Sequence, residues 1–311
     1  MNPLVSIVVT TKNEEQNIAA CLRSITEQTY PHIEVIVIDN NSTDDTKNIA
    51  RKFTSLVFNK GPERSAQRNE GLLRIASGGY CIYLDADMII TPTLVQDCVR
   101  FASDHKVGAL YIPEWVLGSS LFARIRRFER GYYSGTPIDA ARFFDTKLIR
   151  KVGGFDEILF KSGSGEDWDL DKKVKQLAEI ELLCARNLVS RESTAFKVSL
   201  ESHSSLDLNF VGILHNESKD RLIPYLQKKR YYSTGFDGYI QKWGSKDPDL
   251  VSQFSISSRF FKIFFRHGNW TRTLKHPVLF IATLALKFAI GIYVIDQFGS
   301  IHRILAWFKR K

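Results

Sequence analysis

Two short acidic motifs have residue types and a spacing that could support chemistry on a phosphorylated substrate. In the first, Asp85 and Asp87 flank Ala86 directly after the apolar run YCIYL, which places two carboxylates on one side of a turn at a strand end. Oxygen ligands of this kind suit Mg²⁺ or Mn²⁺, and such an ion would neutralise a bound diphosphate. A solvated pair of charges or a helix cap is the plainer alternative for such a triplet.

The second motif, Glu166-Asp167-Trp168-Asp169, opens a predicted helix that runs to about Ala178 and follows a flexible stretch at Gly163–Gly165. Acidic residues are favoured in the first turn of a helix by the helix dipole. The motif is therefore compatible with ordinary capping as well as with a reactive carboxylate.

The sequence pattern around the first motif predicts a parallel sheet that would position it. Apolar runs of strand length alternate with helical patterns of about 10–15 residues, as expected for βα units. The predicted strands are Leu4–Thr11, Ile33–Ile38, Ser55–Phe58 and Tyr80–Leu84. Runs that are apolar throughout are typical of strands buried on both faces. The polar residues Asn13, Asp39, Asp85 and Asp87 follow strand ends, and ligands of open α/β sheets bind beyond those ends.

The pattern continues after Pro92 with further strands and helices. We expect a helix, then strands at Val107–Ile112, Ala140–Asp145 and Ile180–Ala185, a short helix at Thr146–Lys151, and a last apolar segment at Ile213–His215. Residues 114–130 form a basic and aromatic segment to which the sequence assigns no element.

Charge divides the 311-residue chain into two regions. The net charge is +9, but residues 1–218 carry 26 Lys and Arg against 29 Asp and Glu, whereas residues 219–311 carry 17 against 5. We therefore expect an α/β body over 1–218 and a basic, aromatic, helical region over 219–311 with an anionic partner, either a phospholipid surface or nucleic acid. The composition, 44% hydrophobic and 25% charged, excludes disordered and collagen-like chains. Four scattered cysteines without CxxC spacing argue against a zinc finger or a thioredoxin motif.

Ordered motifs of the body resemble the inverting family 2 glycosyltransferases of the GT-A fold. The nucleotide-binding half of that family is similar to SIVVTTKNEEQNIAACLRSITEQTYPHIEVIVIDNNSTDDT followed by ERSAQRNEGLLRIASGGYCIYLDAD, within about residues 1–112. The acceptor-side half is similar to KVGGFDE followed by GEDWDL, within residues 113–218. The resemblance covers about residues 3–218. It implies a Rossmann-like, mostly parallel central sheet flanked by helices and transfer of a sugar from a nucleotide-sugar, without specifying the sugar.

Carried over position by position, the resemblance implies roles for individual residues. The donor pocket would contain Thr10, Thr11, Asn13, Glu14, Asp39, Arg64, Arg68, Asp85 and Ala86. Asp87 and His215 would bind a divalent cation, Mn²⁺ or Mg²⁺. Asp167 would be the catalytic base, with Glu166 and Trp168 on the acceptor side. Asp39-Asn40 departs from the acidic pair that is frequent at this place, so the choice between UDP and GDP stays open.

These roles agree with the chemistry of inverting transfer. An acceptor hydroxyl must lose its proton opposite the leaving diphosphate, for which one carboxylate suffices, and a cation would stabilise the leaving group. Plainer alternatives remain: His215 as a core histidine, Arg64 and Arg68 as a solvated helix face, and Trp168 as a packing residue.

The C-terminal region predicts contact with lipid. Residues 254–275 predict one basic amphipathic helix that lies among lipid headgroups or docks on the body. Residues 278–295 are long and apolar enough to span a bilayer, but Lys287 near the middle would cost about 2.5–3.5 kcal/mol on insertion. Both flanks are basic, including the segment from Arg303 to Lys311. We therefore favour a membrane-embedded or interfacial segment, with a single crossing or a helix paired in an oligomer as alternatives.

The leading hypothesis is a metal-dependent glycosyltransferase that moves a sugar from a UDP- or GDP-sugar to a lipid-linked or surface-glycan acceptor at the cytoplasmic face of the cell membrane. The alternative is a nonenzymatic nucleotide-sugar or polyanion-binding protein with a degenerate transferase fold. The N-terminus predicts a strand and no signal peptide. Nucleic acid is not an expected partner, because the sequence contains none of its recognition motifs.

Overall fold

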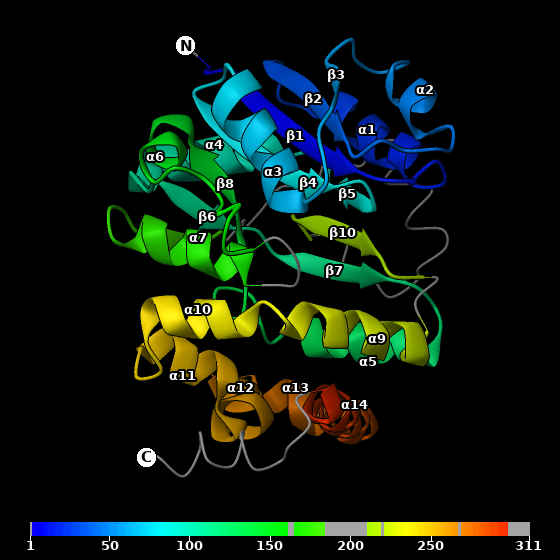
Figure 1. The fold of residues 1–311 in the computed structure, drawn as a ribbon, viewed down its shortest axis with the longest axis vertical. Coiled ribbons are helices and arrows are strands. Elements are labelled where there is room, and N and C mark those ends of the chain that lie inside the picture. The colour runs from blue at the N-terminus through cyan, green and yellow to red at the C-terminus, as the bar shows by residue number, and fades with distance from the viewer. Residues whose placement is uncertain (1, 161–164, 184–209, 219–220, 267–268, 298–311) are drawn as a thin grey trace.

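The computed structural model describes residues 2–160, 165–183, 210–218, 221–266 and 269–297, with the strands above and a helical layer below (Figure 1). Parts of three expectations lie outside the described residues: the stretch at Gly163–Gly165, the end of the predicted strand Ile180–Ala185, and the basic segment Arg303–Lys311.

A seven-stranded sheet forms the centre of the body, in the order β3-β2-β1-β4-β8-β6-β9. Its strands are β1 (Val5–Thr11), β2 (Ile33–Asp39), β3 (Val57–Asn59), β4 (Tyr80–Asp85), β6 (Ala109–Tyr111), β8 (Ala141–Asp145) and β9 (Ile180–Leu182). Strands β1 to β4 run parallel, whereas β8 is antiparallel to both of its neighbours. The predicted mostly parallel sheet flanked by helices is confirmed.

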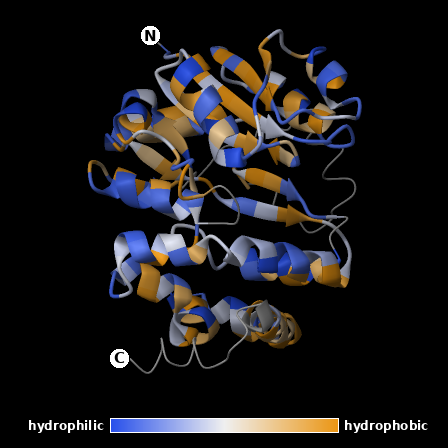
Figure 2. Cartoon of the chain, viewed as in Figure 1, coloured by the Kyte–Doolittle hydropathy of each residue, from blue (hydrophilic) through white to orange (hydrophobic). Residues whose placement is uncertain are grey.

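Alternate side chains of the sheet pack under helices on its two faces. Val5, Ile7 and Val9 of β1 lie in one core cluster with Leu22 and Cys98 from the helices of one face. Those helices are α1 (Ile18–Thr26), α2 (Thr46–Ala50) and α4 (Leu94–His105). On the other face, Val8 and Leu72 lie in a second cluster beneath α3 (Arg64–Asn69), a π-helix (Glu70–Ile75), α6 (Thr146–Lys151) and α7 (Glu166–Lys175). The strongly apolar strands stand out in Figure 2.

A second, three-stranded sheet lies beside the end of β4. Its order is β5 (Met88–Ile90), β10 (Ile213–Asn216) and β7 (Glu114–Leu117). β10 is antiparallel to β5, with His215 opposite Met88, and this register brings a residue from late in the chain beside Asp87. The sequence predicted neither β5 nor β7, because both are too short to carry a periodic signal.

The C-terminal region forms two helical layers under the small sheet (Figure 1). The first contains α9 (Leu222–Ser233) and α10 (Phe236–Trp243) next to α5 (Leu121–Arg130), and the second contains α11 (Pro248–Phe254), α12 (Ile263–Phe265), α13 (Trp270–Lys275) and α14 (Pro277–Gln297). The single helix predicted over 254–275 is wrong. Ser255 and Arg266 adopt extended backbone conformations, which interrupt the helix so that Ile263 and Phe264 can pack with Phe128 of α5.

Helix α14 is apolar on both sides but buried on only one. Thr283, Leu286 and Lys287 are buried against the protein, whereas Val278, Ile281 and Phe288 are exposed. Within the described residues, α14 is the one helix long and apolar enough to cross a membrane, over Pro277–Val294, and 17% of that window is buried.

Candidate active site

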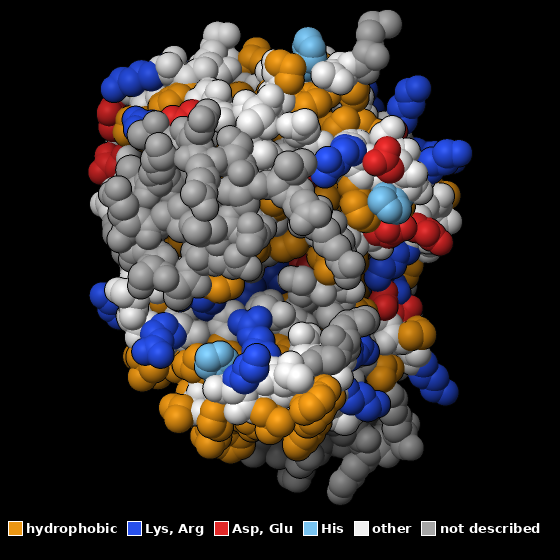
Figure 3. Space-filling view, turned by 180° about the vertical axis from the view of Figure 1, so that it is seen from behind, with side chains coloured by type: hydrophobic (Ala, Val, Ile, Leu, Met, Phe, Trp, Pro, Cys, Tyr) orange, Lys and Arg blue, Asp and Glu red, His pale blue; other side chains and the backbone are white. Residues whose placement is uncertain are grey.

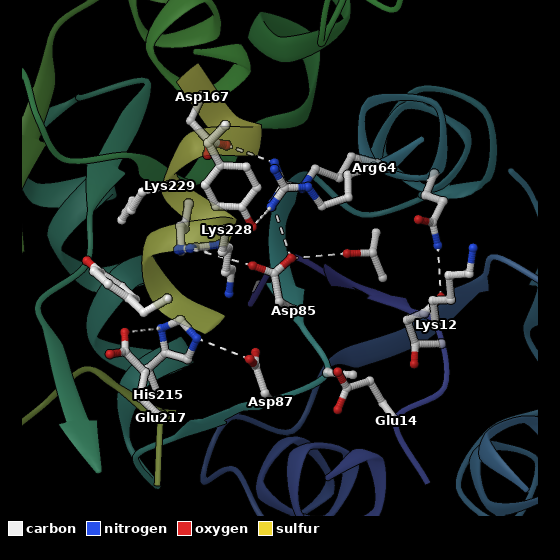
Figure 4. Close-up of a pocket in the computed structure, with 18 of the residues that line it drawn as sticks. Lys12, Glu14, Arg64, Asp85, Asp87, Asp167, His215, Glu217, Lys228 and Lys229 are labelled. Carbon is white, nitrogen blue, oxygen red and sulfur yellow. Dashed lines mark hydrogen bonds and ion pairs between the residues drawn. The ribbon is translucent and has the colours of Figure 1, made fainter. Parts of the chain in front are cut away.

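A cavity of about 350 Å³ lies at the carboxyl ends of β1 and β4, between the body and helix α9 (Figure 4). It brings together ten of the residues singled out from the sequence: Thr10, Thr11, Glu14, Arg64, Arg68, Asp85, Ala86, Asp87, Asp167 and His215. The parallel register of β1 and β4 places Thr10 opposite Asp85. The cavity therefore occupies the place where open α/β sheets bind their ligands.

Arg68 connects the two acidic motifs. Its guanidinium is 1% exposed and donates to Oδ1 of Asp85 at 3.1 Å and to Oδ1 of Asp167 at 2.9 Å. Burial alone would raise the pKa of Asp85, but Arg68 and Arg142 hold it well below its usual range. Asp85 is therefore a carboxylate at neutral pH, and its Oδ1 also accepts a hydrogen bond from Thr10.

Asp87 and His215 form an adjacent pair suited to a divalent cation. Nε2 of His215 lies 3.2 Å from Oδ2 of Asp87, while Oδ1 of Asp87 is buried without a hydrogen-bond partner in the described part of the chain. Burial alone would lower the pKa of His215, but Asp87 and Glu114 raise it well above its usual value. Once a cation displaces the proton from His215, the imidazole nitrogen and the unsatisfied oxygen of Asp87 are a donor set that Mn²⁺ accepts.

No closed metal cage of three or more His, Cys, Asp or Glu side chains occurs within the described ranges. Mg²⁺ is commonly held by one or two carboxylates together with substrate phosphates. The pair of Asp87 and His215 fits a cation whose remaining ligands come from a bound diphosphate and water.

Asp167 is held at one oxygen only. Its Oδ1 accepts hydrogen bonds from Arg68 at 2.9 Å and from the Tyr83 hydroxyl at 2.8 Å, and no hydrogen bond to Oδ2 occurs among the described residues. Gly165, which precedes α7, has a φ of +114°, a conformation that favours glycine and starts the helix at Glu166. The turn thus presents Asp167 to the cavity with one oxygen fixed and the other available.

Glu166 lies beside the cavity without lining it. Its carboxylate is buried and pairs with Arg64 at 2.8 Å and with Arg68 at 3.7 Å. Burial raises the pKa of Glu166 even though Arg64 opposes the shift. This geometry makes Glu166 a residue that orients the two arginines.

Three other residues predicted for the site point elsewhere. Oδ1 of Asn13 accepts a hydrogen bond from the backbone of Thr43 at 2.9 Å. The buried carboxylate of Asp39 accepts from the backbone and the hydroxyl of Ser42, at 2.7 and 2.5 Å. Trp168 stacks on Phe236 and donates to the carbonyl of Ile138. All three lie outside the lining of the cavity, and Asn13 and Asp39 shape the loop next to it.

Residues 6–152, nearly half of the chain, match the family described as Glycosyl transferase family 2. The matched segment lies within the α/β body and contains Asp85 and Asp87.

Curated glycosyltransferases are similar to parts of this chain. Glycosyltransferase GlyA of Streptococcus pneumoniae is 28% identical over 56% of this chain and 28% of its own length. The UDP-Glc:α-D-GlcNAc-diphosphoundecaprenol β-1,3-glucosyltransferase WfaP of Escherichia coli is 33% identical over 35% of this chain and 45% of its own length. The chain thus spans less than half the length of these curated relatives.

A solved structure shows the same fold over most of the chain. The mannosyltransferase PcManGT of Pyrobaculum calidifontis, in complex with GDP-Man and Mn²⁺, superposes with a TM-score of 0.55 at 17% identity, covering 95% of this chain and 88% of its own. The GT-A-like fold expected from the sequence is thereby confirmed.

The family 2 motifs did not reveal the lower wall of the cavity. That wall contains Arg126, Arg142, Glu217, Tyr225, Lys228, Lys229 and Tyr232. The basic segment 114–130 and the tyrosine-rich start of the C-terminal region were visible signals, but nothing in their spacing tied them to the strand ends.

A line of buried ion pairs runs from the metal-suited pair to α14. Glu217, 4.0 Å from His215, accepts from Arg126 at 3.1 and 3.2 Å. Arg126 also pairs with Glu129, which in turn lies 3.1 Å from Nζ of Lys287. Helix α14 is therefore electrostatically connected to the site through α5.

Proposed function

We propose that this protein is a metal-dependent inverting glycosyltransferase that uses a nucleotide-sugar. The observation that carries the proposal is that Asp85, Asp87, His215 and Asp167 surround one cavity at the strand ends of a family 2 domain. A nonenzymatic binding protein would not need Asp167 held with one oxygen directed to the same cavity as a cation pair.

The donor would bind along the upper wall. Thr10, Thr11, Glu14 and Asp85 lie there beside Arg64, and they offer hydroxyl, carboxylate and guanidinium groups to a ribose and a base. Similar proteins include a glucosyltransferase named for UDP-Glc and a mannosyltransferase solved with GDP-Man. We therefore propose a UDP- or GDP-sugar without choosing between them.

The transfer step needs one base. Oδ2 of Asp167 would take the proton of an acceptor hydroxyl, whose oxygen forms a bond to the anomeric carbon as the bond from that carbon to the diphosphate oxygen breaks. General-base assistance of this kind is worth about 10²–10⁴-fold in rate. A cation held by Asp87 and His215 would stabilise the charge on the departing nucleoside diphosphate.

An exposed apolar surface supports docking on a membrane. We define the outer face as Phe265, Leu274, Val278, Ile281, Phe288 and Ile292, all exposed side chains of α12, α13 and α14. Figure 3 shows hydrophobic side chains gathered at this end of the molecule. Isolated apolar residues are ordinary on a surface, but a contiguous apolar face marks a binding surface.

We propose that α14 lies in the lipid interface at the cytoplasmic face of the membrane. Lys287 is only 7% exposed and faces the protein, so the lysine that would penalise a crossing is removed from the outer face. The acceptor would be lipid-linked or a growing surface glycan, and the WfaP relative is named for a diphosphoundecaprenol-linked acceptor.

A donor screen tests the proposal directly. Thermal unfolding would be followed with UDP, GDP and their sugars, each with Mn²⁺ and with EDTA. We expect stabilisation by one nucleotide series that requires the metal, because a ligand that binds the native state raises its apparent stability. If none of the nucleotides stabilises the protein, the transferase proposal is refuted.

A further inference from the structure

One face of α9 lines the cavity with two lysines between two tyrosines. Tyr225, Lys228, Lys229 and Tyr232 are spaced i, i+3, i+4 and i+7, so they form a single stripe along the helix, and all four line the cavity. We call these four residues the α9 stripe. In Figure 4 both lysines rise from the α9 ribbon on the side of the cavity opposite Lys12 and Glu14.

The α9 stripe is held by contacts between cations and rings. Nζ of Lys229 lies 5.1 Å from the ring centre of Tyr225, and Nζ of Lys228 lies 5.9 Å from that of Tyr232. The guanidinium of Arg126 lies 4.7 Å from the Tyr225 ring, and the two tyrosine rings thus fix the lysines at the cavity wall.

Positive charge exceeds negative charge on this wall. Among the lining carboxylates, Glu217 interacts with Lys229 and Glu14 with Lys228, but both oxygens of Glu217 already accept from Arg126. No ion pair to Lys229 occurs in the part of the chain that the structure describes. Burial, and then the nearby Arg126, lowers the pKa of Lys229 to about 7. A bound anion would relieve this unfavourable environment.

The place of the α9 stripe indicates which substrate supplies the anion. The proposed donor groups Thr10, Thr11 and Asp85 lie at the ends of β1 and β4, and Arg64 of α3 contacts the stripe at the ring of Tyr232. Helix α9 packs directly against α14, whose other side is the apolar outer face. A lipid chain lying along that face would bring its phosphate to the level of α9.

We propose that the α9 stripe, together with Arg126, binds the phosphate or diphosphate of a lipid-linked acceptor. The inference rests on the proposed function and specifies its acceptor: an isoprenoid-type chain at the outer face, a phosphate at Lys228 and Lys229, and a hydroxyl directed to Asp167. Charge-assisted hydrogen bonds from ammonium groups are the interactions that such a phosphate requires.

The test measures binding by the full chain in detergent, with the active nucleotide and Mn²⁺ present. Farnesyl phosphate is the probe, and farnesol and inorganic phosphate are the comparison ligands. The variant K228M/K229M removes both charges, K228R/K229R restores them, and K52M/K246M removes two exposed lysines that lie outside the cavity. Thermal unfolding of each variant checks that the fold is intact.

We expect wild type to bind farnesyl phosphate more tightly than either comparison ligand, and K228M/K229M to bind it about 10- to 100-fold more weakly. K228R/K229R should recover most of this affinity, K52M/K246M should match wild type, and nucleotide affinity should change by no more than about twofold. Equal affinity of wild type and K228M/K229M for farnesyl phosphate would overturn the inference.

Two further outcomes would also overturn it. If K228M/K229M loses nucleotide instead of farnesyl phosphate, the lysines serve the donor diphosphate. If inorganic phosphate binds as tightly as farnesyl phosphate, the stripe is a site for free phosphate. A wild-type protein that binds farnesyl phosphate through the lysines but binds no nucleotide would refute the proposed function and leave the phosphate site standing.

Discussion

Lys287, the one charged residue in the stretch Pro277–Val294 of α14, forms an ion pair with Glu129 of α5. Nζ lies 3.1 Å from Oε1 of Glu129 and donates to the Tyr133 hydroxyl at 2.7 Å. Because both charges are buried, the pair fixes which side of α14 faces the protein and leaves the other side apolar.

Replacing Glu129 should destabilise the protein more than replacing Lys287. Glu129→Gln leaves both Lys287 and Arg126 without this carboxylate, and an uncompensated buried charge costs about 3–5 kcal/mol. Lys287→Met should cost less, because Glu129 keeps Arg126 as a partner. Urea unfolding in detergent measures both. Arg74→Met, in an exposed pair with Glu70, is the control and should cost at most about 1 kcal/mol; equal losses in all three variants would contradict the assignment.

Asp167→Asn should abolish transfer while donor binding is nearly unchanged. The amide oxygen can still accept from Arg68 and Tyr83, but an amide cannot take the acceptor proton, so we expect a rate loss of about 10²–10⁴-fold. Turnover of labelled nucleotide-sugar and nucleotide titration separate the two effects. Asp104→Asn, on the exposed side of α4, is the matched control. Retained turnover in Asp167→Asn would remove its role as base.

Asp87→Asn and His215→Gln should each weaken metal-dependent nucleotide binding. Each removes one of the two protein ligands proposed for the cation, and the remaining contacts must then come from the diphosphate and water. EDTA should lower the unfolding temperature of the nucleotide complex in wild type and have a much smaller effect in either variant. A full metal response in both variants would place the cation elsewhere.

Polar substitutions on the outer face should release the protein from lipid. Ile281→Ser, Phe288→Ser and Ile292→Ser together remove apolar area that would otherwise leave water on docking, at about 25 cal/mol per Å². Flotation with anionic liposomes measures the change. Ile158→Ser and Leu177→Ser remove exposed apolar side chains from the body and should leave flotation unaltered. Undiminished flotation of the α14 variant would argue against this surface.

Lys229→Met should stabilise the protein, and more so at low pH. The pKa of Lys229 is about 7 in the folded protein against 10.5 ordinarily, so the unfolded chain binds more protons between these values. Charged Lys229 therefore lowers the free energy of unfolding by its full amount below about pH 7, and this loss of stability disappears as the pH rises towards 10.5. The charges around it are Arg126, Glu129, Lys228 and Arg259.

Urea unfolding of wild type and Lys229→Met near pH 6 and near pH 10 checks this sign. The stabilisation should be larger near pH 6. The matching substitution Lys246→Met, at an exposed lysine, should show no such difference. A larger gain near pH 10 would mean that Lys229 is better solvated than the geometry indicates.

The sequence predicted the upper half of the site and missed the lower half for a physical reason. Asp85 and Asp87 follow a buried strand, and parallel neighbours bring strand ends to one edge, so Thr10 and Asp85 could be placed together from local patterns. The role of Tyr83 could not be predicted, because its hydroxyl contacts Asp167 only when α7 packs over β4. The α9 stripe was assigned to a lipid surface from its charge, although tertiary packing turns that face into the cavity.

The line of buried ion pairs from His215 through Glu217, Arg126 and Glu129 to Lys287 has a practical consequence for anyone preparing this protein. Truncating the chain before α14 to gain solubility would remove Lys287 and leave Glu129 without this partner. The position of Arg126, which pairs with both Glu129 and Glu217, would then be less well fixed, and so would that of His215 beside Glu217. A water-soluble form that keeps its chemistry should instead retain every helix and change only the side chains that point outward.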